Sequence, residues 1–171
     1  MPPVLDIFTD FPRPAVQSHK GRHFKFSINP DTAQKLHSLS TELNTSLYSI
    51  YMAAVQLFFH KYTQQKDFGI GAPIANRNRT QVEEIIGFFV NTITLRAQFK
   101  ENISFVDLVQ RVKNHILDAS ANQDVPFEQI VEEVSEQRDL SRSPLFQVMF
   151  DLQKAPFGRM AAAGIEMSLY D

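Results

Sequence analysis

The sequence predicts an α/β (α+β) fold of two layers, in which helices flank a mixed β-sheet. Segments with an apolar residue at every third or fourth position alternate along the chain with segments in which every second residue is apolar. The first spacing is typical of helices and the second of strands. Interleaved elements of both kinds favour helices packed on a sheet. At 171 residues, with 43% hydrophobic and 21% charged residues, the chain is long enough to bury one core.

The first 22 residues differ in composition from the rest. They contain Pro2, Pro3, Pro12 and Pro14, and proline interrupts a regular helix because it lacks a backbone N–H. We therefore expect an extended arm over residues 1–22, followed by a folded lobe over residues 23–171. Since the sequence stops at Asp171 within strand-like residues, we expect the lobe to be incomplete at its C-terminal end.

Period-two alternation predicts the strands. They are expected over residues 24–28, 67–75, 85–96, 144–152 and, near the end of the chain, 165–170. The segments 76–84 and 155–164 are expected to be loops. In the third strand and its continuation, Ile93, Leu95, Ala97 and Phe99 share the apolar face.

Four helices are predicted, over residues 30–43, 46–62, 104–120 and 126–135. Asn29 is placed to cap the first, with Pro30 in its first turn. The second is apolar nearly all round, so we expect it to be central. Ser104 and Asp107 have the spacing of a capping box at the start of the third, and Pro126 leads the fourth.

Composition and charge exclude several functions. A formal charge of −2 argues against nucleic acid as a partner, because phosphate contacts need a surplus of Lys and Arg. The absence of cysteine excludes disulfides and thiolate metal sites, and the scattered histidines suggest no metal site. The longest apolar run, residues 47–59, is too short to cross a membrane, and the opening residues lack the basic start and continuous apolar stretch of a signal peptide. We predict a cytoplasmic protein with no membrane partner.

Polar residues set among apolar ones are the candidate functional residues. Asn91 lies on the apolar face of its predicted strand, where it either holds a bulge or strand end or contacts a ligand. Asp124 precedes Pro126 and is placed to cap a helix, and Arg142 is placed to pair with Asp139 or a carbonyl. The glycines of GIGAPI do not form a phosphate-binding loop, because Ile and Pro occupy positions such a loop needs.

Four segments in order, GAPIANRNR, IIGFFVNTITLR, NQDVPFEQIV and RDLSRSPLFQVMFDLQ, resemble the condensation domains of nonribosomal peptide synthetases. The leading FTDFPRP resembles the proline-rich segment between the two lobes of those domains. Asn122 stands where the family usually has His, and Phe11 where it has a basic or polar residue. The resemblance covers about residues 8–154 and implies a chloramphenicol acetyltransferase-like lobe.

The resemblance implies a division of labour between lobes. The family's catalytic motif, His-His-x-x-x-Asp-Gly, lies in the N-terminal lobe, and this sequence has neither a His-His pair nor an Asp-Gly dipeptide. The chain then corresponds to the acceptor-side C-terminal lobe, with no catalytic residue of its own and no activity alone. Such domains form amide bonds between aminoacyl or peptidyl thioesters held on carrier proteins.

The implied partners are the N-terminal lobe, peptidyl or acyl carrier proteins and an adjacent adenylation domain. No cofactor is expected to bind directly, because the carrier proteins bring the phosphopantetheine. Asn91 matches the Asn of the family's Phe-Val-Asn-Thr motif, so substrate positioning and structural hydrogen bonding both remain open. Arg77, Asp124 and Arg142 are expected to brace the lobe. The alternative function is a non-catalytic module that docks a carrier protein.

Overall fold

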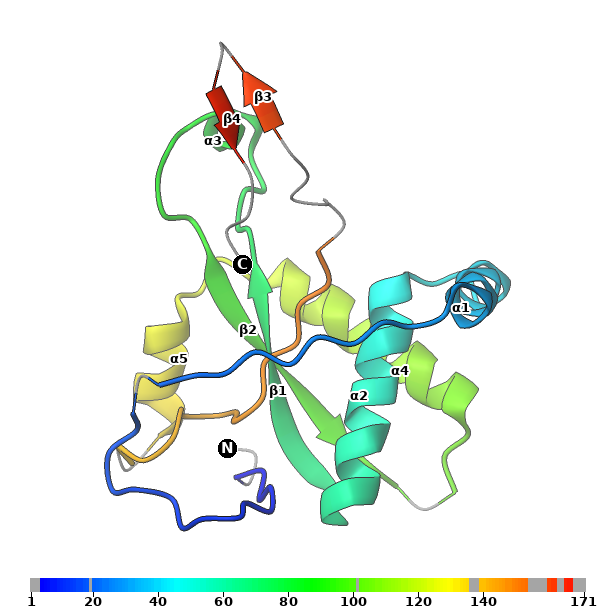
Figure 1. Ribbon diagram of the computed structural model, residues 1–171, viewed down its shortest axis with the longest axis vertical. Coiled ribbons are helices and arrows are strands. Elements are labelled where there is room, and N and C mark those ends of the chain that lie inside the picture. The colour runs from blue at the N-terminus through cyan, green and yellow to red at the C-terminus, as the bar shows by residue number, and fades with distance from the viewer. Residues whose placement is uncertain are drawn as a thin grey trace.

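The computed structural model describes residues 4–18, 20–100, 102–135 and 139–153, together with the strands at 160–162 and 165–167. Its centre is an antiparallel pair of strands, β1 (Asp67–Ile74) and β2 (Asn91–Gln98). Asp67 lies opposite Gln98 and Ile74 opposite Asn91, so β1 ends where β2 begins. A second antiparallel pair, β3 (Met160–Ala162) and β4 (Ile165–Met167), stands apart from it (Figure 1).

In the described part of the chain, five helices accompany the strands: α1 (Pro30–Glu42), α2 (Leu47–Thr63), α3 (Thr80–Glu83), α4 (Phe105–Ala121) and α5 (Phe127–Val134). The side chains of Asn29, Ser46 and Ser104 accept hydrogen bonds from backbone amides at the starts of α1, α2 and α4, as N-caps do. The four predicted helices are confirmed, with boundaries within two residues. None of the helices in the described part is long and apolar enough to cross a membrane.

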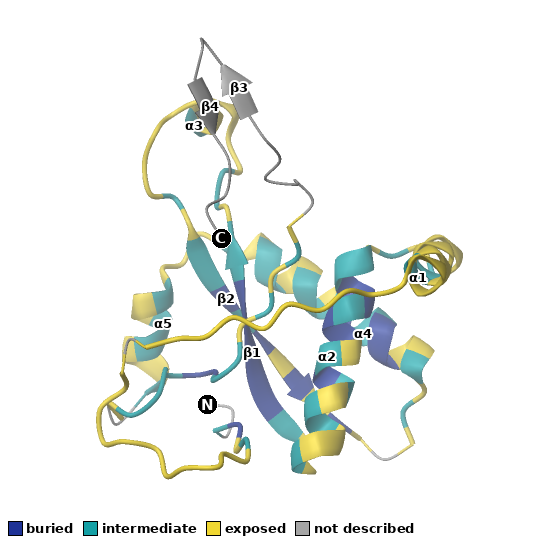
Figure 2. Ribbon diagram, viewed as in Figure 1, coloured by how far each residue is buried: buried dark blue, intermediate teal, exposed yellow. Residues whose placement is uncertain are grey.

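The core lies between the helices and one face of the sheet. Phe68, Ile70 and Ala72 of β1 lie opposite Ala97, Leu95 and Ile93 of β2, and all six are buried (Figure 2). They pack with Ile50, Met52 and Ala53 of α2 and with Leu108, Val109 and Val112 of α4. The predicted apolar face of β2 and the central position of α2 are therefore confirmed.

Leu145 and Phe146 lie against the other face of β1 at Gly69 and Gly71, and the residues that follow them run beside β1 at its edge. This segment runs parallel to β1, and it is joined to Gly71 by hydrogen bonds from Gly71 N to Val148 O and from Phe150 N to Gly71 O, both 2.9 Å. The strand predicted over residues 144–152 is thus reduced to a single bridge at Met149. One cause is the turn at Leu145, whose φ of 65° is left-handed and incompatible with a strand.

Tyr48, on α2, holds the C-terminal end of this segment at Phe150. Its ring stacks on that of Phe150, with 5.4 Å between centroids, and its hydroxyl donates to the Phe150 carbonyl at 3.4 Å. Burial, reinforced by the charge of Asp151, raises the pKa of Tyr48 to about 12. The phenol therefore keeps its proton and its donor role at neutral pH.

The strand predicted over residues 24–28 is wrong. The described backbone of residues 20–29 forms no helix or strand, and Phe24 and Phe26 are 87% and 78% exposed. Alternation identifies side chains suited to a sheet, but a strand also needs a neighbouring edge for its backbone groups.

Three further boundaries differ from prediction. β2 begins only at Asn91, so residues 85–90 are irregular, and the predicted loop at 76–84 contains the one-turn α3. In the predicted loop 155–164, residues 160–162 form β3, whereas residues 155–159, 163 and 164 lie outside the described ones. The last predicted strand is confirmed over Ile165–Met167, and residues 168–170 lie outside the description.

The arm contains no regular element among its described residues, as its prolines predicted, but it is tied to the lobe. Leu5 is buried in the core, and its amide donates to Gln147 Oε1 at 2.6 Å. Farther along, the Gln17 amide donates to the Leu140 carbonyl at 2.9 Å. The division at residue 22 stays a prediction.

An ion pair closes the end of the sheet where β1 begins. Arg96 Nε and Nη2 donate to Asp67 Oδ1 and Oδ2 at 2.8 and 2.6 Å. The hydrogen bonds from Arg96, together with its charge and Gln98, lower the pKa of Asp67. Because 31% of the Asp67 and 46% of the Arg96 side chain is exposed, solvent weakens the pair, and we expect it to contribute less than about 1 kcal/mol.

This pair gives a pH prediction. A carboxyl group whose pKa is lower in the folded state stabilises the fold above its unfolded value of about 3.9, and the stabilisation is lost as pH falls through the folded pKa. Asp67→Asn should therefore lower the free energy of unfolding slightly at pH 7, and the difference from wild type should disappear in acid. Urea titrations at several pH values measure this. A difference that grows below pH 4 would contradict the assignment.

Candidate functional site

Asn91, the first residue of β2, connects the sheet to the turn that leads into α5. Its Nδ2 donates to the carbonyls of Gln123 and Val125, both at 2.8 Å. Its Oδ1 accepts from the amides of Thr92 at 2.8 Å and Phe127 at 3.1 Å. A carboxamide has two N–H donors and an oxygen with two lone pairs, so the chain itself uses all four positions.

This geometry gives a physical reason for a carboxamide at the apolar end of β2. The turn before α5 has backbone groups that no strand or helix satisfies, and Asn91 satisfies three of them. Helix α5 has no side-chain cap of its own, since its N-cap is Pro126, and Asn91 Oδ1 takes that role at the Phe127 amide. Substrate positioning by Asn91 stays a prediction, and a ligand would have to replace one of these four bonds.

A hollow of about 260 Å³ lies beside Asn91. Its walls combine the aromatic rings of Phe88, Phe89 and Phe127 with the polar side chains of Asn76, Asn91, Asp124 and Glu128. Polar and apolar groups line this hollow about equally, whereas small-molecule sites typically have mostly apolar walls with a few polar groups. Asn76, which sequence reasoning missed, has a left-handed φ of 51° and a buried Oδ1 without a hydrogen-bond partner.

Arg77 organises the segment that connects β1 to β2. Its guanidinium donates to four backbone carbonyls, those of Val82, Glu83, Ile85 and Gly87. Its Cζ also lies 4.2 Å from the centre of the Phe89 ring, a cation–π contact. The planar fork of arginine suits several acceptors at once. The bracing predicted for Arg77 has this geometric support, and we call residues 82–90 the β1–β2 loop.

Arg77→Lys should loosen the β1–β2 loop while the core stays folded. A lysine keeps the charge but presents one compact ammonium group in place of the fork, so most of the four carbonyl bonds are lost. We expect backbone amides of residues 82–90 to exchange with solvent about tenfold faster, measured by hydrogen exchange.

Arg79→Lys is the matched control, because Arg79 is exposed and its side chain has no hydrogen bond at the cap of α3. It should leave the exchange of the loop unchanged. Equal acceleration in both variants would contradict the bracing role of Arg77.

The sequence placed Asp124 to cap a helix, because it precedes Pro126, but in the structure Asp124 does not cap α5. Its Oδ1 instead accepts a hydrogen bond from Asn78 Nδ2 at 2.8 Å. This exposed bond joins the β1–β2 connection to the turn that Asn91 also holds. Asn78 was not identified from the sequence, because its partner lies 46 residues away and no local pattern connects them.

Arg142 pairs with Asp139, the local partner that the sequence offered. Its Nε lies 2.9 Å from Asp139 Oδ2. Hydrogen bonds from the Ser141 hydroxyl and amide, followed by the charge of Arg142, lower the pKa of Asp139. The pair therefore stabilises the turn that precedes Leu145, and Arg138, which begins the same motif, lies outside the described residues.

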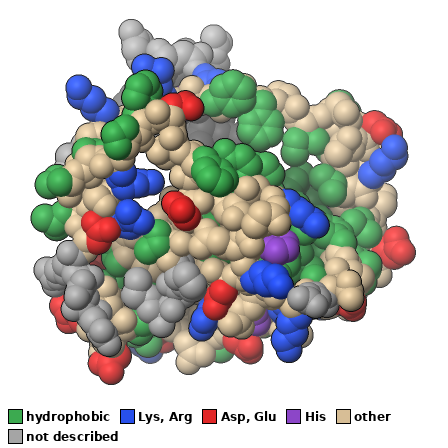
Figure 3. All heavy atoms as spheres, turned by 90° about the horizontal axis from the view of Figure 1, so that it is seen from below, with side chains coloured by type: hydrophobic (Ala, Val, Ile, Leu, Met, Phe, Trp, Pro, Cys, Tyr) green, Lys and Arg blue, Asp and Glu red, His purple; other side chains and the backbone are tan. Residues whose placement is uncertain are grey.

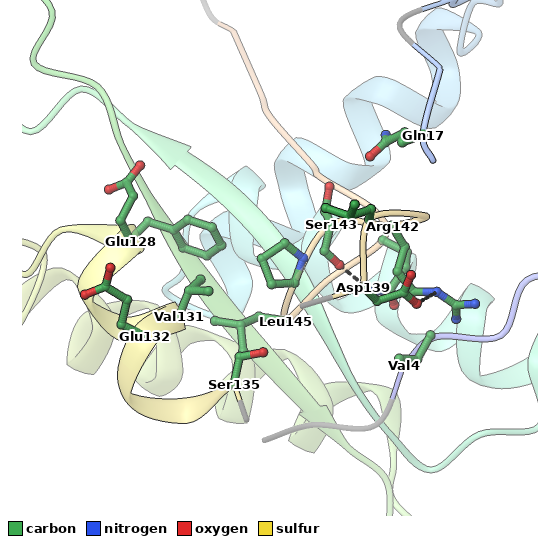
Figure 4. Close-up of a pocket in the computed structure, with 14 residues that line it drawn as sticks. Val4, Gln17, Glu128, Val131, Glu132, Ser135, Asp139, Arg142, Ser143 and Leu145 are labelled. Carbon is green, nitrogen blue, oxygen red and sulfur yellow. Dashed lines mark hydrogen bonds and ion pairs between the residues drawn. The ribbon is translucent and has the colours of Figure 1, made fainter. Parts of the chain in front are cut away.

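A larger cavity of about 520 Å³ lies between the arm, α5 and residues 139–147 (Figure 4). Val131, Pro144 and Leu145 supply its apolar wall, and the Asp139–Arg142 pair lies at one side. Glu128 and Glu132 of α5 line the opposite side. The structure therefore brings Arg142 to this cavity, whereas Asn91 and Asp124 line the smaller hollow and Arg77 braces the loop beside it. Within the described residues, no group of three His, Asp or Glu side chains is placed to hold a metal ion.

Two relatives illustrate what the chain is similar to. It is 43% identical over 151 residues to gramicidin S synthase 2 of Brevibacillus brevis. It is 39% identical over 169 residues to surfactin synthase subunit 1 of Bacillus subtilis (strain 168). These alignments cover 88% and 99% of this chain but only 3% and 5% of the relatives, so the chain spans a small part of their length.

Solved structures show the same fold. A holo four-domain nonribosomal peptide synthetase bound to AMP and glycine matches with a TM-score of 0.80 and 28% identity, over 82% of this chain and 11% of that one. The condensation domain of a monacolin K polyketide synthase matches with a TM-score of 0.68 and 25% identity, over 72% and 29%. The predicted α/β, chloramphenicol acetyltransferase-like fold is confirmed.

The family itself follows from the match along the chain. A model of the condensation domain matches residues 2–167, which include the hollow beside Asn91, the loop held by Arg77 and the turn at Arg142. The relatives in which the same region occurs are peptide synthetases. The chain therefore belongs to the condensation domain family of nonribosomal peptide synthetases.

Proposed function

We propose that this chain forms the acceptor-side wall of an amide-forming centre. In that reaction the amine of the acceptor attacks the carbonyl carbon of the donor thioester. A C–N bond forms, the C–S bond breaks, and the thiol leaves with the proton that the amine loses. The reaction requires alignment of the two reactants and groups that stabilise the developing oxyanion. The hollow beside Asn91 is the proposed place for the acceptor group.

The observation that carries the proposal is the apolar surface beside this hollow. In the β1–β2 loop, Ile86 is 100% and Phe88 91% exposed. Arg77 holds the same loop through backbone carbonyls, so these side chains are presented outward on a braced segment. Large exposed apolar groups that adjoin one another typically mark an interaction surface. We propose that the N-terminal lobe of the same domain covers it and brings the catalytic His to the hollow.

The remaining partners follow from the chemistry. Both reactants are thioesters of phosphopantetheine, so peptidyl or acyl carrier proteins would deliver them and the chain would bind no cofactor directly. An adjacent adenylation domain would activate the acceptor amino acid. We keep a cytoplasmic location as a prediction.

The test uses a complete domain, in which an N-terminal lobe with His-His-x-x-x-Asp-Gly precedes this chain. With two loaded carrier proteins it should form the amide, whereas this chain alone should not. Phe88→Asp should slow amide formation at least about tenfold, because a charge at a buried lobe contact is costly. Coupling by the chain alone would refute the proposal.

Phe58→Asp is the matched control. Phe58 is also exposed, at 58%, but it lies on α2 near the opposite end of the sheet. This variant should keep its activity. A complete domain that binds carrier proteins but forms no amide, despite an intact motif, would support the docking module instead.

A further inference from the structure

The larger cavity shown in Figure 4, which we call the apolar cavity, adjoins the hollow beside Asn91. Phe127 and Glu128, in the first turn of α5, line both of them. The apolar cavity continues along the helix, because Val131 and Ser135, four and eight residues after Phe127, also line it. Residues four apart lie on the same side of a helix. One side of α5 therefore borders the apolar cavity, and the hollow lies at the N-terminal end of that side.

The two spaces differ in size and in polarity. The hollow beside Asn91, of about 260 Å³, is lined about equally by polar and apolar groups, and it is smaller than the range of about 300 to 1,000 Å³ that is typical of small-molecule sites. The apolar cavity, of about 520 Å³, is within that range, and its wall is mostly apolar, with Val4, Val131, Pro144 and Leu145 among its residues. The hollow therefore suits the polar, reacting end of a ligand, and the apolar cavity suits an apolar group attached to it.

The segments around the apolar cavity are held together by hydrogen bonds. The amide of Leu5 donates to Gln147 Oε1 at 2.6 Å, and the amide of Gln17 donates to the Leu140 carbonyl at 2.9 Å, so the arm is attached at two places. Viewed from below, the surface is open on the side where Figure 1 places α5 (Figure 3). A space that already exists in the free protein binds a ligand without the cost of ordering its walls.

We propose that the apolar cavity receives the side chain of the acceptor amino acid and selects acceptors whose side chains are large and apolar, such as phenylalanine. The inference rests on the proposed function, because it takes the acceptor amine to lie in the hollow beside Asn91. The side chain would pass the first turn of α5 and pack on Phe127, Val131 and Leu145. A small side chain would bury less apolar surface there and would gain less binding free energy.

The experiment uses the complete domain with one donor, and loads the acceptor carrier protein with glycine, phenylalanine or lysine. The kcat/KM for the phenylalanyl acceptor should exceed that for the glycyl acceptor at least about tenfold. Val131→Trp should fill part of the apolar cavity and lower this ratio at least about tenfold. Ser143→Trp should do the same from the opposite side of the cavity (Figure 4). A loss of folded protein would slow all acceptors equally, so it cannot lower the ratio.

Gln129→Trp is the matched control, because Gln129 is exposed and lies two residues before Val131, on nearly the opposite side of α5. It should leave the ratio unchanged. Equal kcat/KM for the glycyl and phenylalanyl acceptors, or a ratio that neither Val131→Trp nor Ser143→Trp lowers, would overturn the inference while amide formation continues. A preference for the lysyl acceptor would also overturn it, and would identify Glu128 and Glu132 as the selecting groups. Absence of amide with every acceptor would instead refute the proposed function itself.

Discussion

Gly71→Ala should cost about 3 kcal/mol of folding free energy, at the upper end of what overpacking a buried site typically costs. A Cβ at Gly71 would lie 2.6 Å from two carbon atoms of the Phe146 ring, far inside van der Waals contact. Phe146 is itself buried and packs on Phe127 of α5, with 5.5 Å between ring centroids. The ring therefore has little freedom to move away. Chemical denaturation of the variant and the wild type measures the loss.

The nature of the clash can be tested with Gly69. A Cβ at Gly69 would lie 2.4 Å from the carbonyl oxygen of Leu145. This oxygen belongs to the backbone, so no side-chain substitution can remove the clash. Phe146→Leu should therefore recover part of the stability lost in Gly71→Ala but none of that lost in Gly69→Ala. Equal behaviour of the two double variants would show that contact with the Phe146 ring is not the cause at Gly71.

Gly21→Ala is the control, because a Cβ there meets no atom within 4 Å. It should leave stability unchanged within about 0.5 kcal/mol. A loss at Gly21 similar to that at Gly71 would point to a general effect of removing glycine.

Asn91→Ala should destabilise the chain by about 2–3 kcal/mol, because it leaves the amide of Phe127 and the carbonyls of Gln123 and Val125 without their partner. The loss should be greatest in the turn before α5, where hydrogen exchange should accelerate. Thermal or urea unfolding gives the total. Loss of less than about 0.5 kcal/mol would show that water replaces the carboxamide in this turn.

Two further variants locate the effect. Asn91→Asp keeps an acceptor for the amides of Thr92 and Phe127 but places an oxygen against two carbonyls, so it should be at least as destabilising as Asn91→Ala. Asn78→Ala removes a single exposed bond to Asp124 and should cost less than about 1 kcal/mol. A larger cost for Asn78→Ala than for Asn91→Ala would contradict the central place of Asn91.

The complete domain separates the structural role of Asn91 from substrate positioning. If positioning is its role, Asn91→Ala should reduce the rate of amide formation at temperatures where the variant is still fully folded. If its role is structural, activity should follow the folded fraction, and a stabilising condition should restore it. Rates measured together with the folded fraction distinguish the two.

Much of the fold could be predicted because it depends on local patterns. Asn29, Ser46 and Ser104 cap helices within three residues of their own position, and the apolar face of β2 repeats every second residue. Residues 24–28 show where this reasoning fails, because they alternate as a strand does and yet form no strand. The glycines of β1 have a purpose visible only across the sheet, since Leu145 and Phe146 lie more than 70 residues away in the chain.

The sequence by itself determined helices α1, α2, α4 and α5, the buried face of β2 and the family, because these follow from short-range periodicity and from contiguous motifs. Only the tertiary structure decided what Asn91, Arg77 and Asp124 contact, which residues surround each hollow, and that Leu145 and Phe146 lie against the glycines of β1. The physical reason is that hydrogen-bond partners and cavity walls come from distant parts of the chain, and their distances are set by packing.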